Sequence, residues 1–232
     1  EMARVAAYVA LHLIILFLVA AFLFLRSSWR GSWKTLALSA STYNCGNYGL
    51  PFALLAFPGL EAVVGAVVPT IIMVQMLIAF TLGVLLYEQN GTGIRTILIA
   101  LAKIPVIHAI LLAFILRWLK LEDRLPVQIA DPLNHLSNGL IPIALMTVGV
   151  QISRCPLSRK ISPLIAVGVF RFLASPLLTL VLVWLLRIDS PVREILLGMS
   201  VLPTAVNVYI IAAQYRQDQE LASQAVFWTT LL

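Results

Sequence analysis

The chain has 232 residues, of which 61% are hydrophobic and only 11% are charged, and its mean hydropathy is +0.98. This balance excludes an ordinary soluble domain, in which charged residues make up about a quarter of the chain. The net charge of +6 is spread over short segments between apolar runs, without a continuous basic face that would indicate a nucleic-acid partner. The composition therefore predicts an integral membrane protein.

Seven apolar runs are long enough to cross a bilayer as helices, which takes about 20 residues. They are too long for the strands of a membrane barrel, and they do not alternate with period two. In chain order the runs are 3–25, 35–57, 62–87, 94–118, 132–152, 163–186 and 192–213. An eighth run begins near Leu221 and reaches Leu232, about half the necessary length. We expect an all-α, multi-pass protein of a bacterial inner membrane or a plasma membrane.

The second run is interrupted at its centre by N-C-G-N-Y-G-L-P, which begins at Asn44. Pro51 removes a backbone hydrogen-bond donor, and Gly46 and Gly49 weaken the helix. Asn44 and Asn47 add side-chain amides that hydrocarbon cannot satisfy. Irregular polar backbone at membrane depth is tolerated only where protein buries it or where it lines a cavity. The stretch predicts a broken helix at a binding cavity, and a closely packed, kinked helix is the alternative.

The seventh run carries a similar interruption, V-L-P-T-A-V-N-V-Y, which begins at Val201. Its polar or helix-breaking residues are Pro203, Thr204, Asn207 and Tyr209. The second and seventh runs are an odd number of spans apart, so they cross the membrane in opposite directions. Two broken helices in that relation are typical of an inverted-topology repeat.

A constant offset of 159 residues aligns the two halves and places Asn44 on Pro203. At this offset four pairs in the following runs are identical: Glu61 and Glu220, Ala66 and Ala225, Val67 and Val226, and Thr70 and Thr229. Runs one to three then pair with runs six to eight, and runs four and five have no partners. We therefore expect this sequence to be a fragment of about seven and a half spans from a chain of ten.

Three segments, in the right order, carry a family resemblance. N-C-G-N-Y-G-L-P resembles the signature N-x-G-x-x-G-x-P, and I-P-I-A-L-M-T-V-G-V, residues 141–150, resembles P-x-A-L-x-x-x-G. L-P-T-A-V-N-V-Y-I-I-A-A-Q-Y, residues 202–215, is similar to P-x-A-V-N-x-Y-x-x-A-x-x-Y. These are signatures of the auxin efflux carrier family, which includes plant auxin exporters and bacterial malate or malonate permeases. One departure is Ile104 before Pro105, where many relatives have asparagine.

The resemblance implies ten helices in two inverted halves, with two broken helices that cross. Residues 1–87 and 163–232 would form the two repeat-related parts of a moving transport domain, and 94–152 would belong to a scaffold domain. The first crossing helix would carry Asn44, Gly46, Gly49 and Pro51, and the second would carry Pro203, Ala205, Asn207 and Tyr209.

Function follows from the broken backbone. Half-helix N-termini attract an anion, and freed carbonyls can hold a cation. We therefore expect a secondary transporter that moves a small organic anion, auxin-like or a mono- or dicarboxylate, by alternating access. The predicted substrate-binding residues are Asn44, Gly46, Asn47, Gly49, Pro51, Arg171, Pro203, Thr204, Asn207 and Tyr209.

Arg171 lies about eight residues inside the sixth run. It is interpreted as the partner of a substrate carboxylate. Two alternatives stay open: the side chain reaches the nearby membrane surface, or it contacts carbonyls freed by Pro176. Lys103 in the fourth run is interpreted as a residue that reaches the surface.

No carboxylate lies near the centre of any run, where proton-coupled carriers often keep one. His108 is an alternative proton acceptor or a packed, hydrogen-bonded residue. Coupling to protons or sodium and a homodimer stay open, lipid surrounds the spans, and no cofactor, metal or nucleic acid is expected.

Two other classes of protein fit the sequence less well. An intramembrane enzyme would need a nucleophile with its base, paired aspartates or H-E-x-x-H, and the sequence offers none of these motifs. A seven-helix receptor or other non-transport membrane protein fits the number of complete runs. Such a receptor gives no reason for two inverted breaks, so a transporter is the preferred interpretation.

Overall fold

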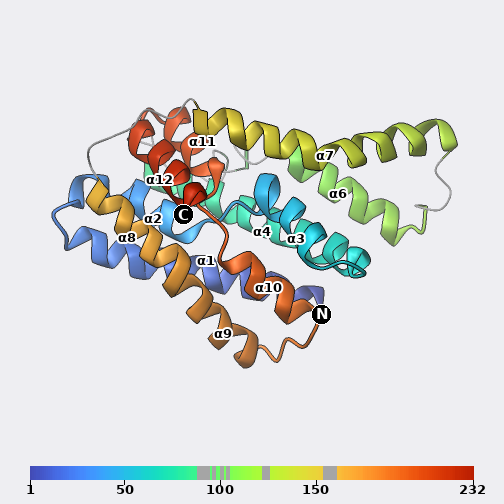
Figure 1. Ribbon diagram of the computed structural model, residues 1–232, viewed down its shortest axis with the longest axis horizontal. Helices are drawn as coiled ribbons and strands as arrows, with labels where there is room; N and C mark the ends of the chain where they lie inside the picture. Colours follow the sequence, from blue (N-terminus) through green and yellow to red (C-terminus); the bar gives the residue numbers. More distant parts are fainter. Residues whose placement is uncertain (88–94, 96–97, 100–101, 103–104, 122–125, 154–160) are drawn as a thin grey trace.

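The computed structural model describes residues 1–87, 95, 98–99, 102, 105–121, 126–153 and 161–232 (Figure 1). Within this part every regular element is helical apart from one two-residue bridge, so the all-α class is confirmed. The elements are α1 (Met2–Leu25), η1 (Arg30–Ser32), α2 (Trp33–Ser41), η2 (Cys45–Gly49), α3 (Leu50–Ala56), α4 (Glu61–Tyr87), α6 (Pro105–Trp118), α7 (Val127–Ser153), α8 (Ile161–Val169), η4 (Phe170–Ala174), α9 (Ser175–Leu185), α10 (Val192–Ser200), α11 (Val206–Gln214) and α12 (Gln219–Leu231).

Three helices of the described part are long and apolar enough to cross a membrane. They are α1, α4 and the continuous helix formed by α8, η4 and α9. The second and seventh apolar runs are each divided into shorter helices, and part of the fourth run lies outside the described residues. The total number of spans therefore stays a prediction.

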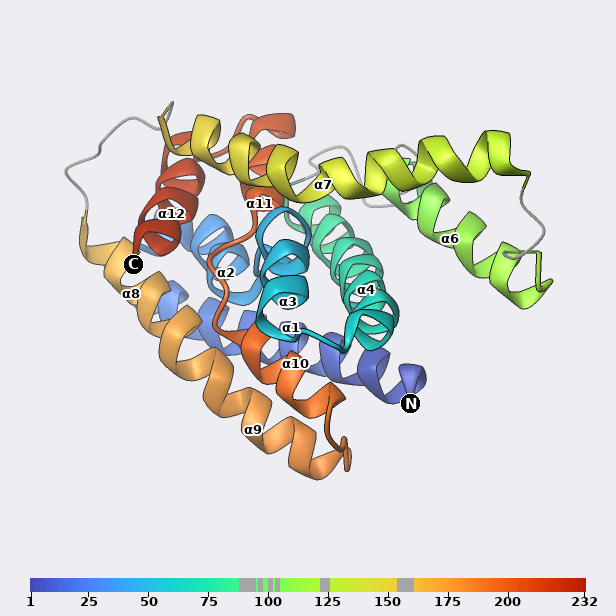
Figure 2. The same cartoon turned by 45° about the vertical axis from the view of Figure 1, so that its right-hand side comes forward.

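Both interruptions found in the sequence are breaks in the helical backbone. In the second run α2 ends at Ser41, and the π-helical turn η2 leads into α3. In the seventh run α10 ends at Ser200, and α11 begins at Val206. The extended chain after α10 passes beside α2 and α3 near the centre of the molecule (Figure 2).

The two breaks are joined directly, backbone to backbone. Tyr43 and Thr204 form an antiparallel bridge. The Asn44 N–H donates to the Pro203 carbonyl at 2.8 Å, and the Ala205 N–H donates to the Thr42 carbonyl at 3.1 Å. Each break therefore supplies one donor and one acceptor to the other, which satisfies four backbone groups that hydrocarbon would leave unpaired.

Two clusters of buried apolar side chains surround this crossing. The first includes Leu36 of α2, Val208 of α11 and Ala225 of α12. The second includes Val67 of α4 and Ile195 of α10. Helices α1 and α4 contribute to both clusters, and so they tie the two sides together.

Helices α6 and α7 extend to one side of the other helices (Figures 1 and 2). Most of their described side chains are exposed. Helix α7 nevertheless packs against η2 and α3, and α6 packs against α4. The predicted scaffold runs thus border the first broken helix.

Gly49 lies at a close contact between the two broken helices. A Cβ added there would lie 2.7 Å from Leu202 Cδ1 and 2.7 Å from Met199 Cε, and both atoms belong to the second broken run. At Gly46, three residues earlier, a Cβ would meet no atom within 4 Å. A side chain at position 49 would therefore require Leu202 and Met199 to move, whereas one at position 46 would require no such movement.

We expect Gly49→Val to lower the free energy of unfolding by about 1–3 kcal/mol, the usual cost of overpacking a core. The matched change Gly46→Val adds the same side chain in open space and should cost clearly less. Thermal unfolding of both purified variants in detergent measures the difference. Equal destabilisation by the two changes would contradict this account of Gly49.

Candidate functional site

Asn44 places a side-chain amide at the crossing. Its backbone is fully used, because the N–H donates to Pro203 and the carbonyl accepts from the Gly49 N–H at 2.8 Å. Only 5% of the residue is exposed, and its Nδ2 has no hydrogen-bond partner in the part of the chain that the structure describes. A buried amide donor without an acceptor is costly, so this group is available to a ligand.

The second halves of the broken helices begin beside Asn44. Gly46, Asn47 and Tyr48 in η2 are half-buried, as is Asn207 in the first turn of α11. The first N–H groups of a helix have no acceptor inside that helix, and they carry its positive dipole end. Open space lies next to Gly46. Backbone donors from η2 and side-chain amides therefore lie at the same end of this break.

Helices α4 and α12 hold the two breaks in position. Gln75 of α4 donates its Nε2 to the Tyr43 carbonyl at 2.6 Å, and its Oε1 accepts from the Tyr43 N–H at 3.4 Å. Thr229 of α12 accepts from the Thr204 N–H at 3.0 Å, while the Thr204 hydroxyl donates to the Ser39 carbonyl at 2.9 Å. Each broken helix is thus supported by a side chain from the helix that follows it.

Arg171 lies in η4 and is completely buried. It donates to the carbonyls of Leu202 and Ala40, both at 3.2 Å, and of Ser200 at 2.9 Å. Its Nη2 also donates to the Ser175 hydroxyl at 3.2 Å. These partners differ from the substrate carboxylate that the sequence suggested. Contact with freed carbonyls is observed, and these carbonyls belong to the two broken runs and not to the turn before Pro176. A contact between Arg171 and a substrate carboxylate stays a prediction.

A further buried polar group was missed at the level of sequence. His12 of α1 is completely buried, and its Nε2 lies 3.2 Å from the Ser175 hydroxyl. Tyr8, one turn earlier, has its hydroxyl 2.8 Å from Thr179 Oγ1. A histidine in the middle of an apolar run was the available signal. Gln75, alone in the third run, gave the same kind of signal.

The predicted site residues separate into two groups. Asn44, Gly49, Pro203 and Thr204 meet at the crossing, and Pro51 is buried in the first turn of α3. Gly46, Asn47 and Asn207 lie at the half-buried starts of η2 and α11.

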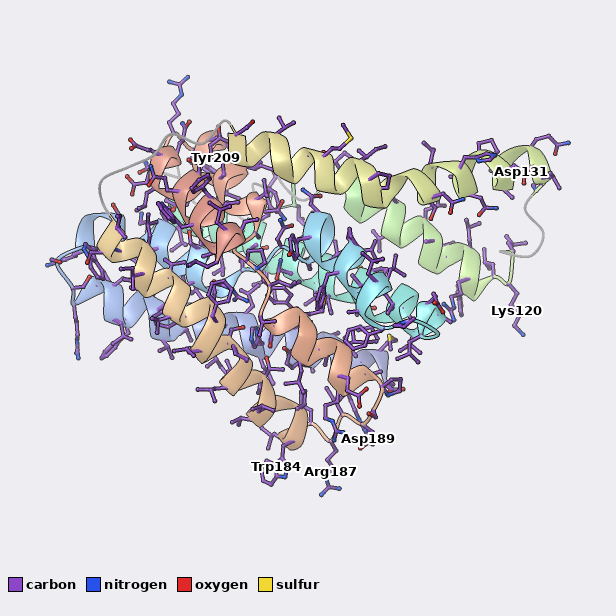
Figure 3. The ribbon with its side chains drawn as sticks, viewed as in Figure 1. Lys120, Asp131, Trp184, Arg187, Asp189 and Tyr209 are labelled. Atoms are coloured by element: carbon purple, nitrogen blue, oxygen red, sulfur yellow. The ribbon has the colours of Figure 1, made fainter. Side chains whose placement is uncertain are left out.

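Tyr209 lies apart from the crossing. It is 41% exposed and is located at one side of α11 (Figure 3). Lys103 and Ile104 lie outside the described residues. His108 lies on α6, away from the crossing, and its role as a proton acceptor stays a prediction.

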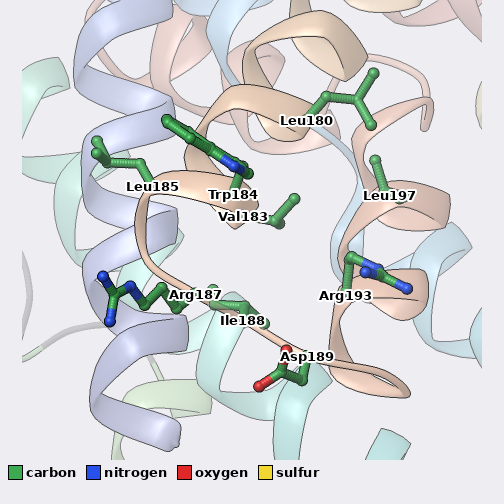
Figure 4. A pocket seen from close by; sticks show the side chains of 9 residues that line it. All are labelled: Leu180, Val183, Trp184, Leu185, Arg187, Ile188, Asp189, Arg193 and Leu197. Atoms are coloured by element: carbon green, nitrogen blue, oxygen red, sulfur yellow. The ribbon is translucent and has the colours of Figure 1, made fainter.

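An open pocket lies at a different place, between the end of α9 and α10 (Figure 4). Trp184, Arg187, Asp189 and Arg193 line it together with aliphatic side chains. None of the predicted site residues takes part in this pocket. It lies at the end of the helix bundle that carries exposed Trp184 (Figure 3), and it does not reach the crossing.

Interrupted helices that meet inside the membrane, with polar groups at their ends, are typical of membrane transporters. Residues 93–232 match the sequence model of the family described as "Membrane transport protein". The match covers more than half of the chain. The protein therefore belongs to this family, the auxin efflux carrier family, and the resemblance drawn from its three segments is confirmed.

Two relatives are also transporters by description. An uncharacterized transporter of Methanocaldococcus jannaschii is 28% identical over 199 residues, which is 84% of this chain and 63% of the relative. A protein of Rhizobium meliloti described as "Putative malonate transporter" is 30% identical over 116 residues, which is 50% of this chain and 36% of the relative. The chain thus matches less than two thirds of the length of either relative.

We expect Gln75→Leu to destabilise the protein by about 1–3 kcal/mol, because it removes the acceptor of the buried Tyr43 N–H and leaves the Tyr43 carbonyl with the Cys45 N–H as its donor. Thr81→Val in the same helix is the control, since the Thr81 hydroxyl bonds only to the Leu77 carbonyl of its own helix. Thermal unfolding in detergent compares the two variants. If the leucine variant unfolds no earlier than the valine control, Gln75 does not hold the break.

Proposed function

We propose that the protein is a secondary transporter that moves a small organic anion by alternating access, with the substrate at the crossing of the two broken helices. Family membership and both relatives support transport. The single observation that carries the site is the buried Asn44 amide without a partner, beside the N-terminal ends of η2 and α11. Such donors complement the oxygens of a carboxylate.

The charge of the substrate follows from which backbone groups are already used. Carbonyls near the ends of α2 and α10 accept hydrogen bonds from Arg171. The starts of η2 and α11 present donors instead, and neither start has a side-chain cap. Donors without acceptors favour a negatively charged ligand. Asn44, Gly46, Asn47 and Asn207 are the residues that we assign to it first.

An inverted repeat underlies the proposed mechanism. The two breaks are joined by an antiparallel bridge, in which each break gives one N–H and one carbonyl to the other. Shifting the bounds of α2 by 159 residues gives the bounds of α10, and the same shift places His12 on Arg171. The agreement of the helix bounds with the offset found in the sequence supports the two-fold relation.

The two parts of the moving domain follow from this repeat. Residues 1–87 and 163–232 would move together as the transport domain, because the bridge joins them. Residues 94–152 would provide the scaffold, with α7 against η2 and α3. Movement of the crossing past α7 would then open the Asn44 site to one side of the membrane at a time.

The substrate class is narrowed by one relative only. The Rhizobium meliloti protein is described by the word malonate, and a short dicarboxylate suits two facing sets of donors. We therefore consider a short mono- or dicarboxylate a better candidate for the substrate than an auxin-like anion. The alternative of a seven-helix receptor is disfavoured by membership of a transport family.

Reconstitution of the full-length protein in liposomes tests the proposal. We expect uptake of radiolabelled malonate, malate or auxin above that of protein-free liposomes, with competition by unlabelled carboxylates. Donors lie at the starts of both η2 and α11. We therefore expect malonate, which has two carboxylates, to compete better than its monomethyl ester, which has one. Transport of a neutral or cationic solute without any carboxylate transport would contradict an anion site.

Replacing Asn44 or Asn207 with leucine should lower carboxylate transport at least about tenfold, since one hydrogen bond to a charged group contributes about 1.5–3 kcal/mol. Asn134→Leu on α7 is the matched control, because Asn134 is exposed and lies one turn from Asp131 at the far end of that helix (Figure 3). Initial uptake rates at equal amounts of folded protein measure the effect. Parental rates in both crossing variants would show that these amides do not touch the substrate.

A further inference from the structure

Arg171 is the largest fully buried side chain of the described part. It projects from the π-helical turn η4, and its guanidinium reaches both broken runs at once. Its carbon Cζ also lies 5.3 Å from the centre of the Tyr43 ring. Among the described residues its partners are carbonyls, one hydroxyl and this ring, and no carboxylate is among them. A full positive charge is thus held inside the protein without an acidic partner.

The carbonyls that Arg171 binds share one property. Ala40 lies in the last turn of α2, Ser200 is the last residue of α10, and Leu202 follows in the extended chain. These are C-terminal ends of half-helices, where carbonyls have no N–H partner inside the helix. Each helix end carries about half a negative charge, so two ends together offset about one positive charge. In other broken-helix carriers such carbonyls coordinate a sodium ion.

We infer that Arg171 is the resident cation of the crossing and takes the place that a coupling sodium ion would occupy, so that transport by this protein does not depend on sodium. The guanidinium is suited to this role because its planar fork donates in several directions at once. It already binds carbonyls from both broken runs. The expectation for transport rests on the proposed function. The expectation that sodium does not stabilise the folded protein is independent of it.

The neighbourhood of Arg171 supports a fixed position for this charge. Ser175 accepts from Arg171 and donates to the Ser200 carbonyl at 2.7 Å, so it fastens the guanidinium to the end of α10. Among the described residues, the titratable groups around it are His12 and Tyr8 of α1 and Tyr43 of the first break. With both helix ends occupied, little negative potential remains to attract a second cation.

The decisive measurement is the thermal stability of the full-length parent protein in detergent, with sodium chloride replaced by N-methyl-D-glucamine chloride at equal ionic strength. We expect the same melting temperature in both salts. A saturable rise in melting temperature with sodium would overturn the inference, because an ion that binds the folded state must stabilise it. This comparison needs no substrate, so a failure of the proposed function leaves it intact.

Three variants test the role of the charge itself. Arg171→Lys keeps the charge and should retain a higher melting temperature than Arg171→Gln, which leaves the carbonyls of both half-helices without a cation. Lys34→Gln is the control, because Lys34 donates to a single helix-end carbonyl, that of Leu86, from a half-buried position. It should change the melting temperature least. A glutamine variant at position 171 as stable as the lysine variant would also overturn the inference.

Liposome uptake provides the functional arm. Allosteric or coupled ligands commonly change each other's affinity by about 5- to 150-fold. We expect replacing sodium with potassium or choline to change the rate of carboxylate uptake by the parent less than about twofold. A sodium gradient that drives accumulation would contradict the inference. Absence of all carboxylate uptake would contradict the proposed function and not the result of the stability comparison.

Discussion

The structure depends on one constraint: two helices are broken inside a medium where water cannot satisfy the freed backbone groups. Each break supplies hydrogen-bond partners to the other. The two breaks pair with each other through the Asn44 and Ala205 N–H groups, and Gln75 and Thr229 satisfy further groups from the helices that follow. Arg171 accounts for the carbonyls at the ends of both first halves. Fold and site therefore share the same hydrogen bonds.

The proposed site consists of polar groups that this pairing leaves without partners. Acceptors at the crossing are largely used, by Arg171 and by the bridge, whereas the Asn44 amide is buried without a partner. Among the described residues, the crossing therefore has more unpaired donors than unpaired acceptors. In a region of low dielectric, such an excess of donors favours an anionic ligand. A substrate carboxylate and Arg171 would then complement opposite ends of the same broken helices, one at the starts and one at the ends. The two roles do not compete.

Several features could be predicted from the sequence because they are local. Glycine, proline and asparagine together in an apolar run predict a break in the helix. Both breaks lie at the interruptions that contain Asn44 and Pro203. The carbonyl partners of Arg171 could not be predicted, because they lie 29 to 131 residues away along the chain. Gln75 and His12 were missed for the same reason. A single polar residue shows that a partner is needed, and only the packing of helices shows which one.

The bridge between the two breaks is not in the register of the proposed repeat. The offset of 159 relates α2 to α10 and aligns Asn44 with Pro203, but the bridge pairs Tyr43 with Thr204. The extended segment before the bridge is therefore longer in the second half, since Tyr43 follows Ser41 closely and Thr204 is farther from Ser200. That extra length lets the Leu202 carbonyl reach Arg171, while the first half offers the Ala40 carbonyl from within α2. A single arginine in one half can thus serve both breaks, and His12 at the equivalent position in the other half is left to bind Ser175. Under the proposed two-fold relation, the two halves differ at the residues that contact this one charge.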